Sequence, residues 1–327
     1  MAHIKPPNKA YTFMKKQLFI SLLSFVIISG SMLFFINSKT SETNDNERMH
    51  QFQDNYKIFS IKKPKTVSFA GEQINLNDPD IYEKFDRELH VNTYWQSNTI
   101  LLIKRSKKYF PIIEPILKKH GVPDDFKYLA VAESGLQNVT SPAGAKGFWQ
   151  FMKSAAKEHK LEVSKTVDER YHLEKATEAA CKYLLKSKAD LGNADWLTVA
   201  ASYNMGITGI KRQQARQKSK HYLDLLLNSE TARYIYRISA LKLILEQPKE
   251  YGFFVNPDDL YKLVPTNIVV VDSTIDNLAD FAHIYGINYK QLKVHNPWLR
   301  EAFLTDVSRK KYEIKIPDTS FYTFEHN

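Results

Sequence analysis

The sequence predicts a mainly α-helical protein with one N-terminal transmembrane helix and a small βααβ domain at its C-terminal end. Three observations lead to this prediction: an uncharged apolar run near the N-terminus, helical spacing of apolar residues over residues 81–250, and β-branched alternation near the C-terminus. The 327 residues suffice for about two domains of ordinary size. Hydrophobic residues make up 43% of the chain and charged residues 25%, which is typical of globular proteins and excludes a wholly disordered chain.

The N-terminal apolar run has the length of a membrane span. Residues 18–36 carry no charge, and these 19 residues would form a helix of about 28 Å, close to the thickness of the hydrocarbon core. Four lysines and no acid precede the run, so the N-terminus is expected in the cytoplasm and the rest of the chain outside it. We expect an uncleaved signal anchor in the cytoplasmic membrane. A cleaved signal peptide, which would leave the protein exported, is the alternative.

Changes in composition divide the remainder of the chain. A polar, weakly patterned tether follows the apolar run, with a short strand expected at Thr66–Phe69. Prolines and a glycine after Gln247 indicate a linker between the helical and βααβ segments. The predicted boundaries are 1–16 for a cytoplasmic basic segment, 17–37 for the anchor, 38–80 for the tether, 81–250 for the helical domain, 251–265 for the linker, 266–317 for the βααβ domain and 318–327 for a tail.

Start and stop signals define the elements of both domains. Gly121 and Gly206 are expected to end helices, Pro123 to begin one, Asp195 to cap one, and Pro248 to follow the last long one. The expected helices of the helical domain are 93–108, 109–120, 123–133, 195–206 and 231–247. In the βααβ domain, the expected strands are 268–271 and 312–316, and the expected helices are 275–285 and Tyr289–His295.

Charge and cysteine usage limit the classes of partner. The 46 basic and 36 acidic residues leave a net charge of +10, which favours polyanions or anionic surfaces. Nucleic acid is not expected, because the topology is exported and no basic recognition helix is interleaved with aromatic residues. The single cysteine, Cys181, excludes an intrachain disulfide and a cysteine-based metal site. No histidine pair has metal-ligand spacing near an acid, so we expect no metal and no cofactor.

Glu133 is the strongest candidate for chemistry. It stands at the C-terminal end of an apolar helix, where the negative helix end and the apolar surroundings both disfavour a charged carboxylate. A carboxyl group that stays neutral near pH 7 is what a general acid requires. Considered alone, a helix-end acid that faces water is the more common case.

Three further segments stand out beside Glu133. Residues 141–151 are rich in small residues, which permit close approach of the backbone, and they include Trp149 and Gln150 as an apolar plate and an amide. Residues 168–170, Asp-Glu-Arg, are expected to form a structural ion-pair cluster. Tyr203 and Asn204 end a helix with a phenol and an amide. Taken singly, a tryptophan such as Trp149 is more often a core residue.

In this order and spacing, the four segments resemble the lysozyme-like catalytic domain of the soluble-type lytic transglycosylases, over residues 124–251. The resemblance implies that Glu133 is the sole catalytic acid and base and that Ser134 orients it. It implies that Gln150, Tyr203 and Asn204, with Trp149, bind the sugar chain. The implied reaction is cleavage, without water, of the β-1,4 bond between N-acetylmuramic acid and N-acetylglucosamine in peptidoglycan, which leaves 1,6-anhydro ends.

The C-terminal 50 or so residues are similar to a LysM module, which the same family carries after its catalytic domain. Two other functions remain open from the sequence. One is a hydrolytic muramidase on the same fold, in which water attacks instead of a substrate hydroxyl. The other is an inactive peptidoglycan-binding scaffold. The predicted partners are glycan strands and, through the N-terminal helix, a membrane. The sequence predicts no particular protein partner.

Overall fold

The computed structural model describes residues 47, 49–50, 58–305 and 310–322. The predicted anchor at residues 17–37 and the basic segment before it lie outside the described residues. Among the residues that are described, no helix is long and apolar enough to cross a membrane. The chain divides into two compact units, 1–60 and 61–327, and the description below concerns the second.

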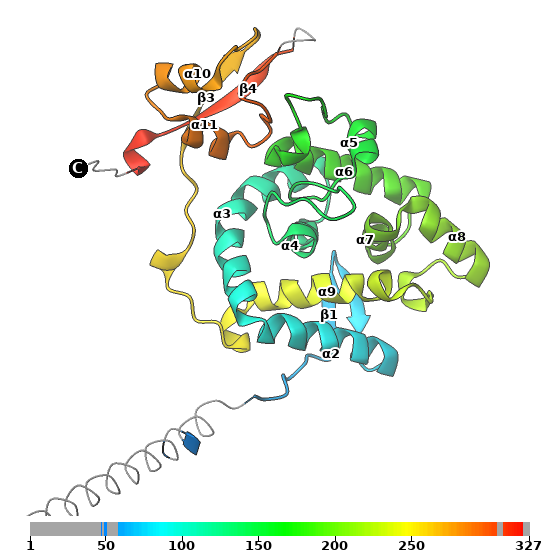
Figure 1. Cartoon of the computed structure of the whole chain (residues 1–327). Helices are drawn as coiled ribbons and strands as arrows, with labels where there is room; N and C mark the ends of the chain where they lie inside the picture. The colour runs from blue at the N-terminus through cyan, green and yellow to red at the C-terminus, as the bar shows by residue number, and fades with distance from the viewer. Residues whose placement is uncertain (1–46, 48, 51–57, 306–309, 323–327) are drawn as a thin grey trace, which may run out of the picture. The chain divides into compact units, whose positions relative to one another are not determined.

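The helical domain is built around a short central helix, α4. Helices α2 and α9 pack side by side, and α4 packs against α3 and α9 (Figure 1). The helices are α2 (Pro79–Tyr94), α3 (Gln96–His120), α4 (Lys127–Ser134), α5 (Lys153–Glu158), α6 (Leu173–Asp190), α7 (Trp196–Met205), α8 (Ile207–Gln217) and α9 (Ser229–Glu246). Single 3-10 turns are η1 (Asp124–Phe126), η2 (Glu169–Tyr171), η3 (Tyr222–Asp224) and η4 (Pro248–Tyr251).

A two-stranded hairpin precedes the helices. β1 (Thr66–Phe69) is the strand expected from the sequence, and it pairs antiparallel with β2 (Glu72–Asn75). Phe69, Ile74 and Leu76 are fully buried in the core of the helical domain. The tether predicted through residue 80 is therefore too long, because the apolar side chains of the hairpin belong to the folded domain.

The long helix α3 differs from the two helices expected over residues 93–120. It is one helix of 25 residues that contains Pro111 and Pro115. Each proline removes one backbone hydrogen bond, which accounts for the bend of α3 in Figure 1. The helix ends where predicted, at Gly121, whose φ of 69° is in the left-handed region.

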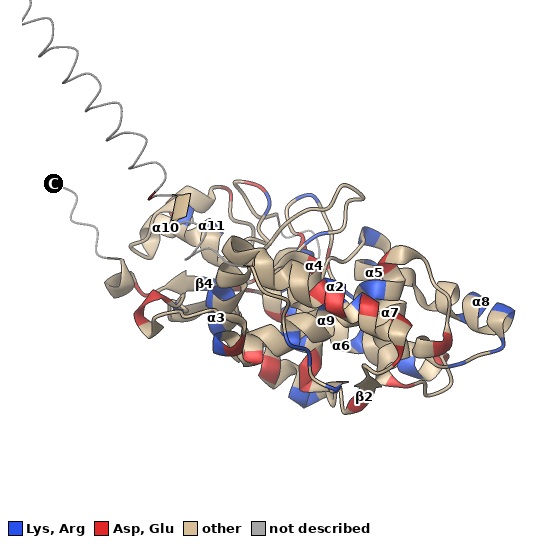
Figure 2. Cartoon of the chain, turned by 90° about the horizontal axis from the view of Figure 1, so that it is seen from below, with Lys and Arg blue, Asp and Glu red and all other residues tan. Residues whose placement is uncertain are grey.

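The later helix ends follow their sequence signals closely. Asp195 caps α7 as predicted, and its carboxylate accepts the N–H of Thr198 at 2.7 Å. Gly206 ends α7 and leads directly into α8, which carries Lys and Arg but no acidic residue (Figure 2). The expected helix at residues 123–133 begins instead with η1 and becomes α4 at Lys127.

The C-terminal domain has the predicted βααβ order. Its elements are β3 (Thr266–Val271), α10 (Leu278–Ile284), α11 (Tyr289–His295) and β4 (Tyr312–Pro317), and the 3-10 turns η5 (Pro257–Asp259) and η6 (Thr319–Phe321) flank it. β3 and β4 form an antiparallel pair in which Val269 lies opposite Ile314. Helix α10 begins later than predicted because Asn277 is its N-cap and accepts the N–H of Ala279 at 2.8 Å.

The C-terminal domain is packed onto the helical domain through the segment before α6. The N–H of Asp168 donates to the carbonyl of Trp298 at 2.9 Å, and the N–H of Arg300 donates to the carbonyl of Thr166 at 2.8 Å. Between these two bonds, Val167 pairs with Leu299 in an isolated antiparallel bridge. Val167 and Tyr171 are buried in the apolar core of the C-terminal domain. This core is therefore shared between the two domains.

Asp168 and Arg170 form the structural ion pair expected from the sequence. Arg170 is 4% exposed, and its Nε and Nη2 donate to the two carboxylate oxygens of Asp168 at 2.9 and 2.7 Å. Its Nη1 donates to the carbonyls of Gly144 and Phe151, both at 3.3 Å. The guanidinium thus holds the two ends of the loop that carries Gly147. At Gly147, where φ is +79°, a Cβ atom would lie 1.8 Å from the carbonyl oxygen of Arg170.

The closeness of the Arg170 carbonyl to Gly147 predicts that adding one methyl group at this glycine destabilises the fold strongly. Gly147→Ala is expected to lower the free energy of unfolding by about 3 kcal/mol or more, because backbone must move. Gly144→Ala is the matched control, since φ is +87° there but no atom lies within 4 Å of the new Cβ. It should cost only about 1 kcal/mol from backbone strain. Urea denaturation measures both, and equal losses would show that the contact at Gly147 relaxes freely.

Candidate active site

Glu133 lies near the end of α4, the central helix. Leu129 and Ala130 are fully buried and Val131 is 3% exposed, so most of this short helix lies within the core. Gly135 ends the helix with a φ of 60° and returns its N–H to the carbonyl of Val131. Glu133 itself is partly exposed. The core therefore holds the backbone of α4 rigidly while one carboxyl group reaches its edge.

The surroundings of Glu133 favour its neutral form. Burial raises the pKa of its carboxyl group to about 7, although a hydrogen bond from Tyr234 and the charge of Arg237 act in the opposite direction. The negative charge of Glu230 adds to the increase in pKa. At neutral pH a substantial fraction of Glu133 is thus protonated and can donate a proton.

Tyr234 on α9 is the residue that sequence reasoning missed. Its hydroxyl donates to Oε1 of Glu133 in a short hydrogen bond. The side chain is only 2% exposed, so the pattern of α9 marks Tyr234 as an ordinary core residue. A buried tyrosine hydroxyl requires a partner, which was the available signal. Identifying that partner requires knowing that α4 packs against α9.

Ser134 does not contact the carboxylate of its neighbour. Its hydroxyl donates to the carbonyl of Ala130 at 3.1 Å and accepts the N–H of Gln137 at 3.4 Å. Both bonds hold the end of α4 and the turn after it. In this structure the hydrogen bond that orients Glu133 comes from Tyr234, where the resemblance had implied Ser134.

Tyr203 and Asn204 hold the end of α7 against its neighbours. The hydroxyl of Tyr203 donates to the carbonyl of Trp149 at 2.7 Å. Burial raises the pKa of Tyr203 well above its usual value, and the charge of Glu133 adds to this increase, which places the two groups near each other. Asn204 accepts from the hydroxyl of Thr231 at 2.7 Å and donates to Glu230 at 3.1 Å.

Gln150 and Trp149 occupy different environments. Gln150 is partly buried, and its amide nitrogen donates to the carbonyls of Gly147 at 2.7 Å and Val139 at 3.2 Å. Trp149 is 0% exposed, and its ring N–H donates to Thr177 at 2.9 Å. Trp149 therefore lies in the core and presents no surface to a ligand. Its burial contradicts the sugar-binding role that the resemblance implies for Trp149.

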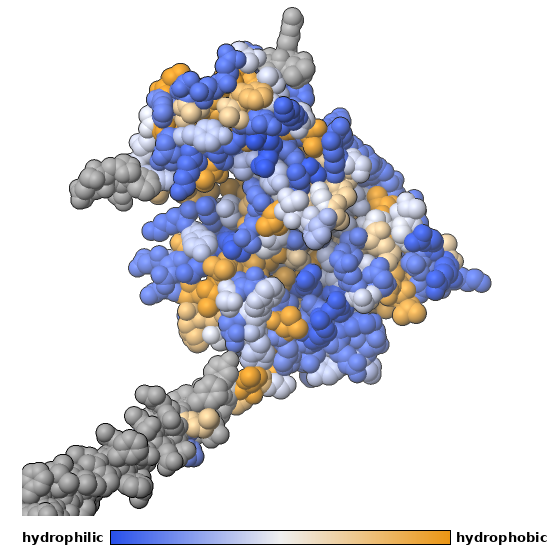
Figure 3. Space-filling model, in the orientation of Figure 1, coloured by the Kyte–Doolittle hydropathy of each residue, from blue (hydrophilic) through white to orange (hydrophobic). Residues whose placement is uncertain are grey.

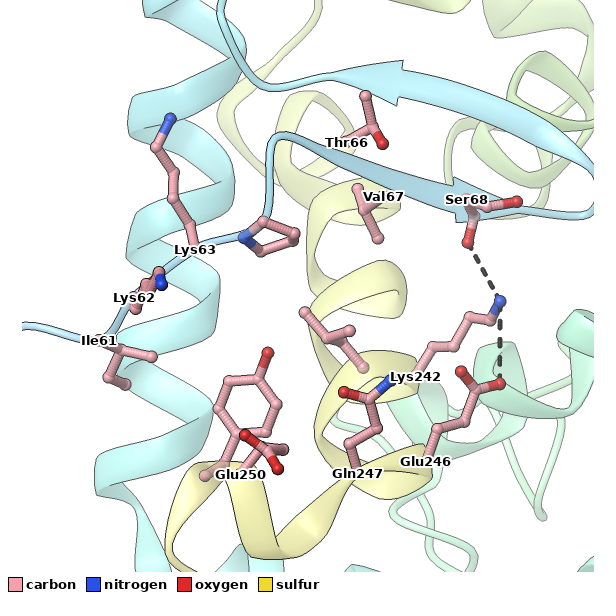
Figure 4. Close-up of a pocket in the computed structure, with 13 residues that line it drawn as sticks. Ile61, Lys62, Lys63, Thr66, Val67, Ser68, Lys242, Glu246, Gln247 and Glu250 are labelled. Atoms are coloured by element: carbon pink, nitrogen blue, oxygen red, sulfur yellow. Dashed lines mark hydrogen bonds and ion pairs between the residues drawn. The ribbon is translucent and has the colours of Figure 1, made fainter.

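No predicted site residue lines the cavity of about 510 Å³ shown in Figure 4. This cavity lies between the segment before β1 and the C-terminal end of α9. Lys242 extends beside it, donates to the carbonyl of Ser68 at 3.2 Å, and pairs with Glu246 and Asp125. Among the described residues, no group of three or more His, Cys, Asp or Glu side chains could hold a metal ion.

Comparison with known proteins matches both domains. Residues 110–225 match the family described as Transglycosylase SLT domain. The helical domain contains a transglycosylase SLT domain. Residues 267–320 match the family described as Soluble lytic transglycosylase C-terminal LysM-like domain. The SLT match includes Glu133, Gln150 and Asn204, whereas Tyr234 lies beyond its end.

The chain is also homologous to two curated proteins. These are the membrane-bound lytic murein transglycosylases D of Escherichia coli strain K12 and of Escherichia coli O6:H1, each 27% identical over 245 residues. The matched region covers 72% of this chain and 52% of each relative. The chain thus spans about half the length of the curated relatives it matches.

The hydrogen bond from Tyr234 predicts the direction of a pKa change. Tyr234→Phe removes a donor to the carboxylate and is expected to raise the pKa of Glu133 above its value of about 7. Ser134→Ala is the control and should leave that pKa unchanged, because the serine does not contact the carboxyl group. Carbon-13 NMR titration of the glutamate side chains measures both. A shift in the serine variant alone would return the orienting role to Ser134.

The raised pKa of Glu133 also predicts that replacing this residue by an uncharged one increases the free energy of unfolding. The folded state binds this proton more tightly than the unfolded chain, so the ionised carboxyl destabilises the fold as pH rises from about 4.5 to about 7. Glu133→Gln should therefore be more stable than the parent by up to about 3 kcal/mol at pH 8. The difference should vanish at pH 4. Thermal melts at both pH values measure it, and a pH-independent difference would contradict the raised pKa.

Proposed function

We propose that this chain is a peptidoglycan lytic transglycosylase that cleaves the β-1,4 bond between N-acetylmuramic acid and N-acetylglucosamine and leaves 1,6-anhydro-N-acetylmuramic acid ends. The observation that carries the proposal is the single carboxyl group of Glu133, partly buried, bonded to Tyr234 and with a pKa raised to about 7. The SLT domain and the homology to lytic murein transglycosylases support it.

Glu133 acts first as an acid and then as a base. Neutral Glu133 donates its proton to the glycosidic oxygen while the bond from that oxygen to C1 of the muramic acid breaks. The C6 hydroxyl of the same sugar forms the new bond to C1, and ionised Glu133 takes the hydroxyl proton. Glu133 thus returns to its starting state without water. Because the attacking group belongs to the substrate, its entropy cost is already met.

The neighbouring side chains have supporting roles in this proposal. Tyr234 fixes the orientation of the Glu133 carboxyl and stabilises the carboxylate that forms after proton donation. Gln150, Tyr203 and Asn204 position the sugar and its acetamide groups by hydrogen bonds. Their present partners are backbone carbonyls and α9 side chains, so these contacts set where each polar group stands before substrate arrives.

The predicted anchor completes the proposed cellular role. We propose that residues 17–37 hold the protein in the cytoplasmic membrane, with the SLT domain facing the peptidoglycan from the periplasm. The two Escherichia coli relatives are named as membrane-bound enzymes. The net charge of +10 suits a substrate whose stem peptides carry carboxylates. The role would be turnover of the cell wall.

A hydrolytic muramidase is the second candidate, and Glu230 is the observation that favours it. A hydrolase of this kind needs a second carboxylate beside the bond to activate water or the sugar. Glu230 is close enough to influence the pKa of Glu133, but it is exposed and bonded to Asn204. Glu230→Gln therefore separates the two chemistries.

The deciding experiment identifies the products that the full chain, in detergent, forms from purified peptidoglycan. Mass spectrometry is expected to find muropeptides lighter by one water than hydrolysis products, with the rate falling above about pH 7 as Glu133 ionises. Glu133→Gln should lower turnover by about a thousandfold. Glu158→Gln, an exposed acid on α5, is the matched control and should keep it.

Two results would overturn the proposal. Reducing-end hydrolysis products that disappear in Glu230→Gln would establish the muramidase. Absence of any product from a folded chain that still binds peptidoglycan would establish a binding scaffold.

A further inference from the structure

A cavity of about 410 Å³ lies between the SLT domain and the LysM-like C-terminal domain. Figure 3 shows a hollow between the two on this face of the molecule. Its walls are largely apolar and aromatic, and both domains supply them. The lining includes Tyr109, Ile112, Phe148 and Leu173 from the SLT domain, and Ile268, Val294 and Trp298 from the LysM-like domain. This size and composition are typical of small-ligand pockets.

The polar groups of the cavity leave an excess of positive charge. Lys315 is paired with Glu174, and Nδ1 of His172 lies 3.2 Å from the same carboxylate. Burial opposes ionisation of Glu174, but these two partners outweigh it and lower its pKa to about 2. Lys108, in contrast, has no carboxylate within ion-pairing distance in the part of the chain that the structure describes.

His295, which also lines the cavity, adds no charge at neutral pH. Burial lowers the pKa of His295, and the charges of Lys108 and Lys315 lower it further. His295 also bonds to the hydroxyl of Tyr322 at 2.6 Å. Lys108, a half-buried residue of the lining, is therefore the unpaired cation that an anion entering the cavity would meet.

The cavity leads toward the end of α4. It shares Lys108, Tyr109, Asn138 and Phe148 with a second cavity of about 340 Å³, which is also lined by Arg105 and by Leu136 and Gln137. Arg105 donates to the carbonyl of Gly135 at 3.2 Å, two residues after Glu133. Within the described ranges Arg105 has no acidic partner either. Two basic side chains, Arg105 and Lys108, thus lie between the end of α4 and the apolar cavity.

We propose that this interdomain cavity binds the stem peptide of the peptidoglycan strand, with Lys108 and Arg105 facing its carboxylates and the aromatic walls facing its aliphatic parts. This inference rests on the proposed function, because that function supplies the strand to which the peptide is attached. The match is chemical: a stem peptide combines aliphatic parts with several carboxylates, whereas a strand without peptides offers hydroxyl and acetamide groups and only the lactyl carboxylate of each muramic acid. The LysM-like domain is then one wall of a substrate site.

The first test compares peptide-bearing strands with strands whose peptides an amidase has removed. The parent chain is expected to show a kcat/KM about tenfold higher on peptide-bearing strands, and Lys108→Glu should abolish that preference mainly through KM. Lys108→Met, which removes the charge without reversing it, should give an intermediate ratio. Lys107→Glu is the matched control, one residue away but exposed, and should keep the parent ratio. An unchanged ratio in Lys108→Glu would overturn the proposal.

The second test measures binding without catalysis. The murein tripeptide L-alanyl-γ-D-glutamyl-meso-diaminopimelate is titrated into the full chain and into its Lys108→Glu variant, with Lys107→Glu as control. Isothermal titration calorimetry gives the dissociation constant of each. Binding that Lys108→Glu weakens about tenfold supports the site even if no anhydro product is ever found, in which case the proposed function alone has failed. Anhydro products formed equally from both strand types, without tripeptide binding, would leave the function standing and refute the site.

Discussion

The buried ion pair between Asp168 and Arg170 is the interaction on which the arrangement of the site depends. A buried ion pair stabilises a fold only when its remaining hydrogen-bonding capacity is met. Here the pair is bidentate, and the guanidinium also binds the carbonyls of Gly144 and Phe151. One guanidinium therefore fixes the loop that carries Gln150. The backbone of the same segment forms the bridge to the C-terminal domain at Val167.

Opposing effects set the pKa of the Glu133 carboxyl group in the SLT domain. Burial favours neutral Glu133, whereas the Tyr234 hydroxyl and Arg237 favour the carboxylate. Burial has the larger effect, but the opposing groups hold the pKa near neutrality. In the proposed reaction Glu133 both gives and takes a proton, and such a group works best when neither state is strongly preferred. The contact between α4 and α9, which brings Tyr234 to the carboxyl group, thus helps to set the pKa of Glu133.

Sequence signals that act locally predicted the ends of several helices. Gly121, Asp195 and Gly206 end or cap helices as expected, because each acts through its own backbone or its nearest neighbours. The sequence predicted that Glu133 stands at the end of an apolar helix, and α4 has it there, whereas its catalytic role stays a proposal. The role of Tyr234 could not be predicted, because it depends on which helices pack together. The same holds for the core position of Trp149, which periodicity does not distinguish from an exposed plate.

The shared core around Val167 and Tyr171 has a consequence for the linker between the domains. Backbone hydrogen bonds, ion pairs and apolar packing join the two domains without its help. A protease that cut the chain between η4 and β3 would leave two fragments that remain associated as a noncovalent complex. Contacts at the segment around Val167, and not the linker, therefore hold the LysM-like domain in place. The length of the linker is free to vary as long as this segment is preserved.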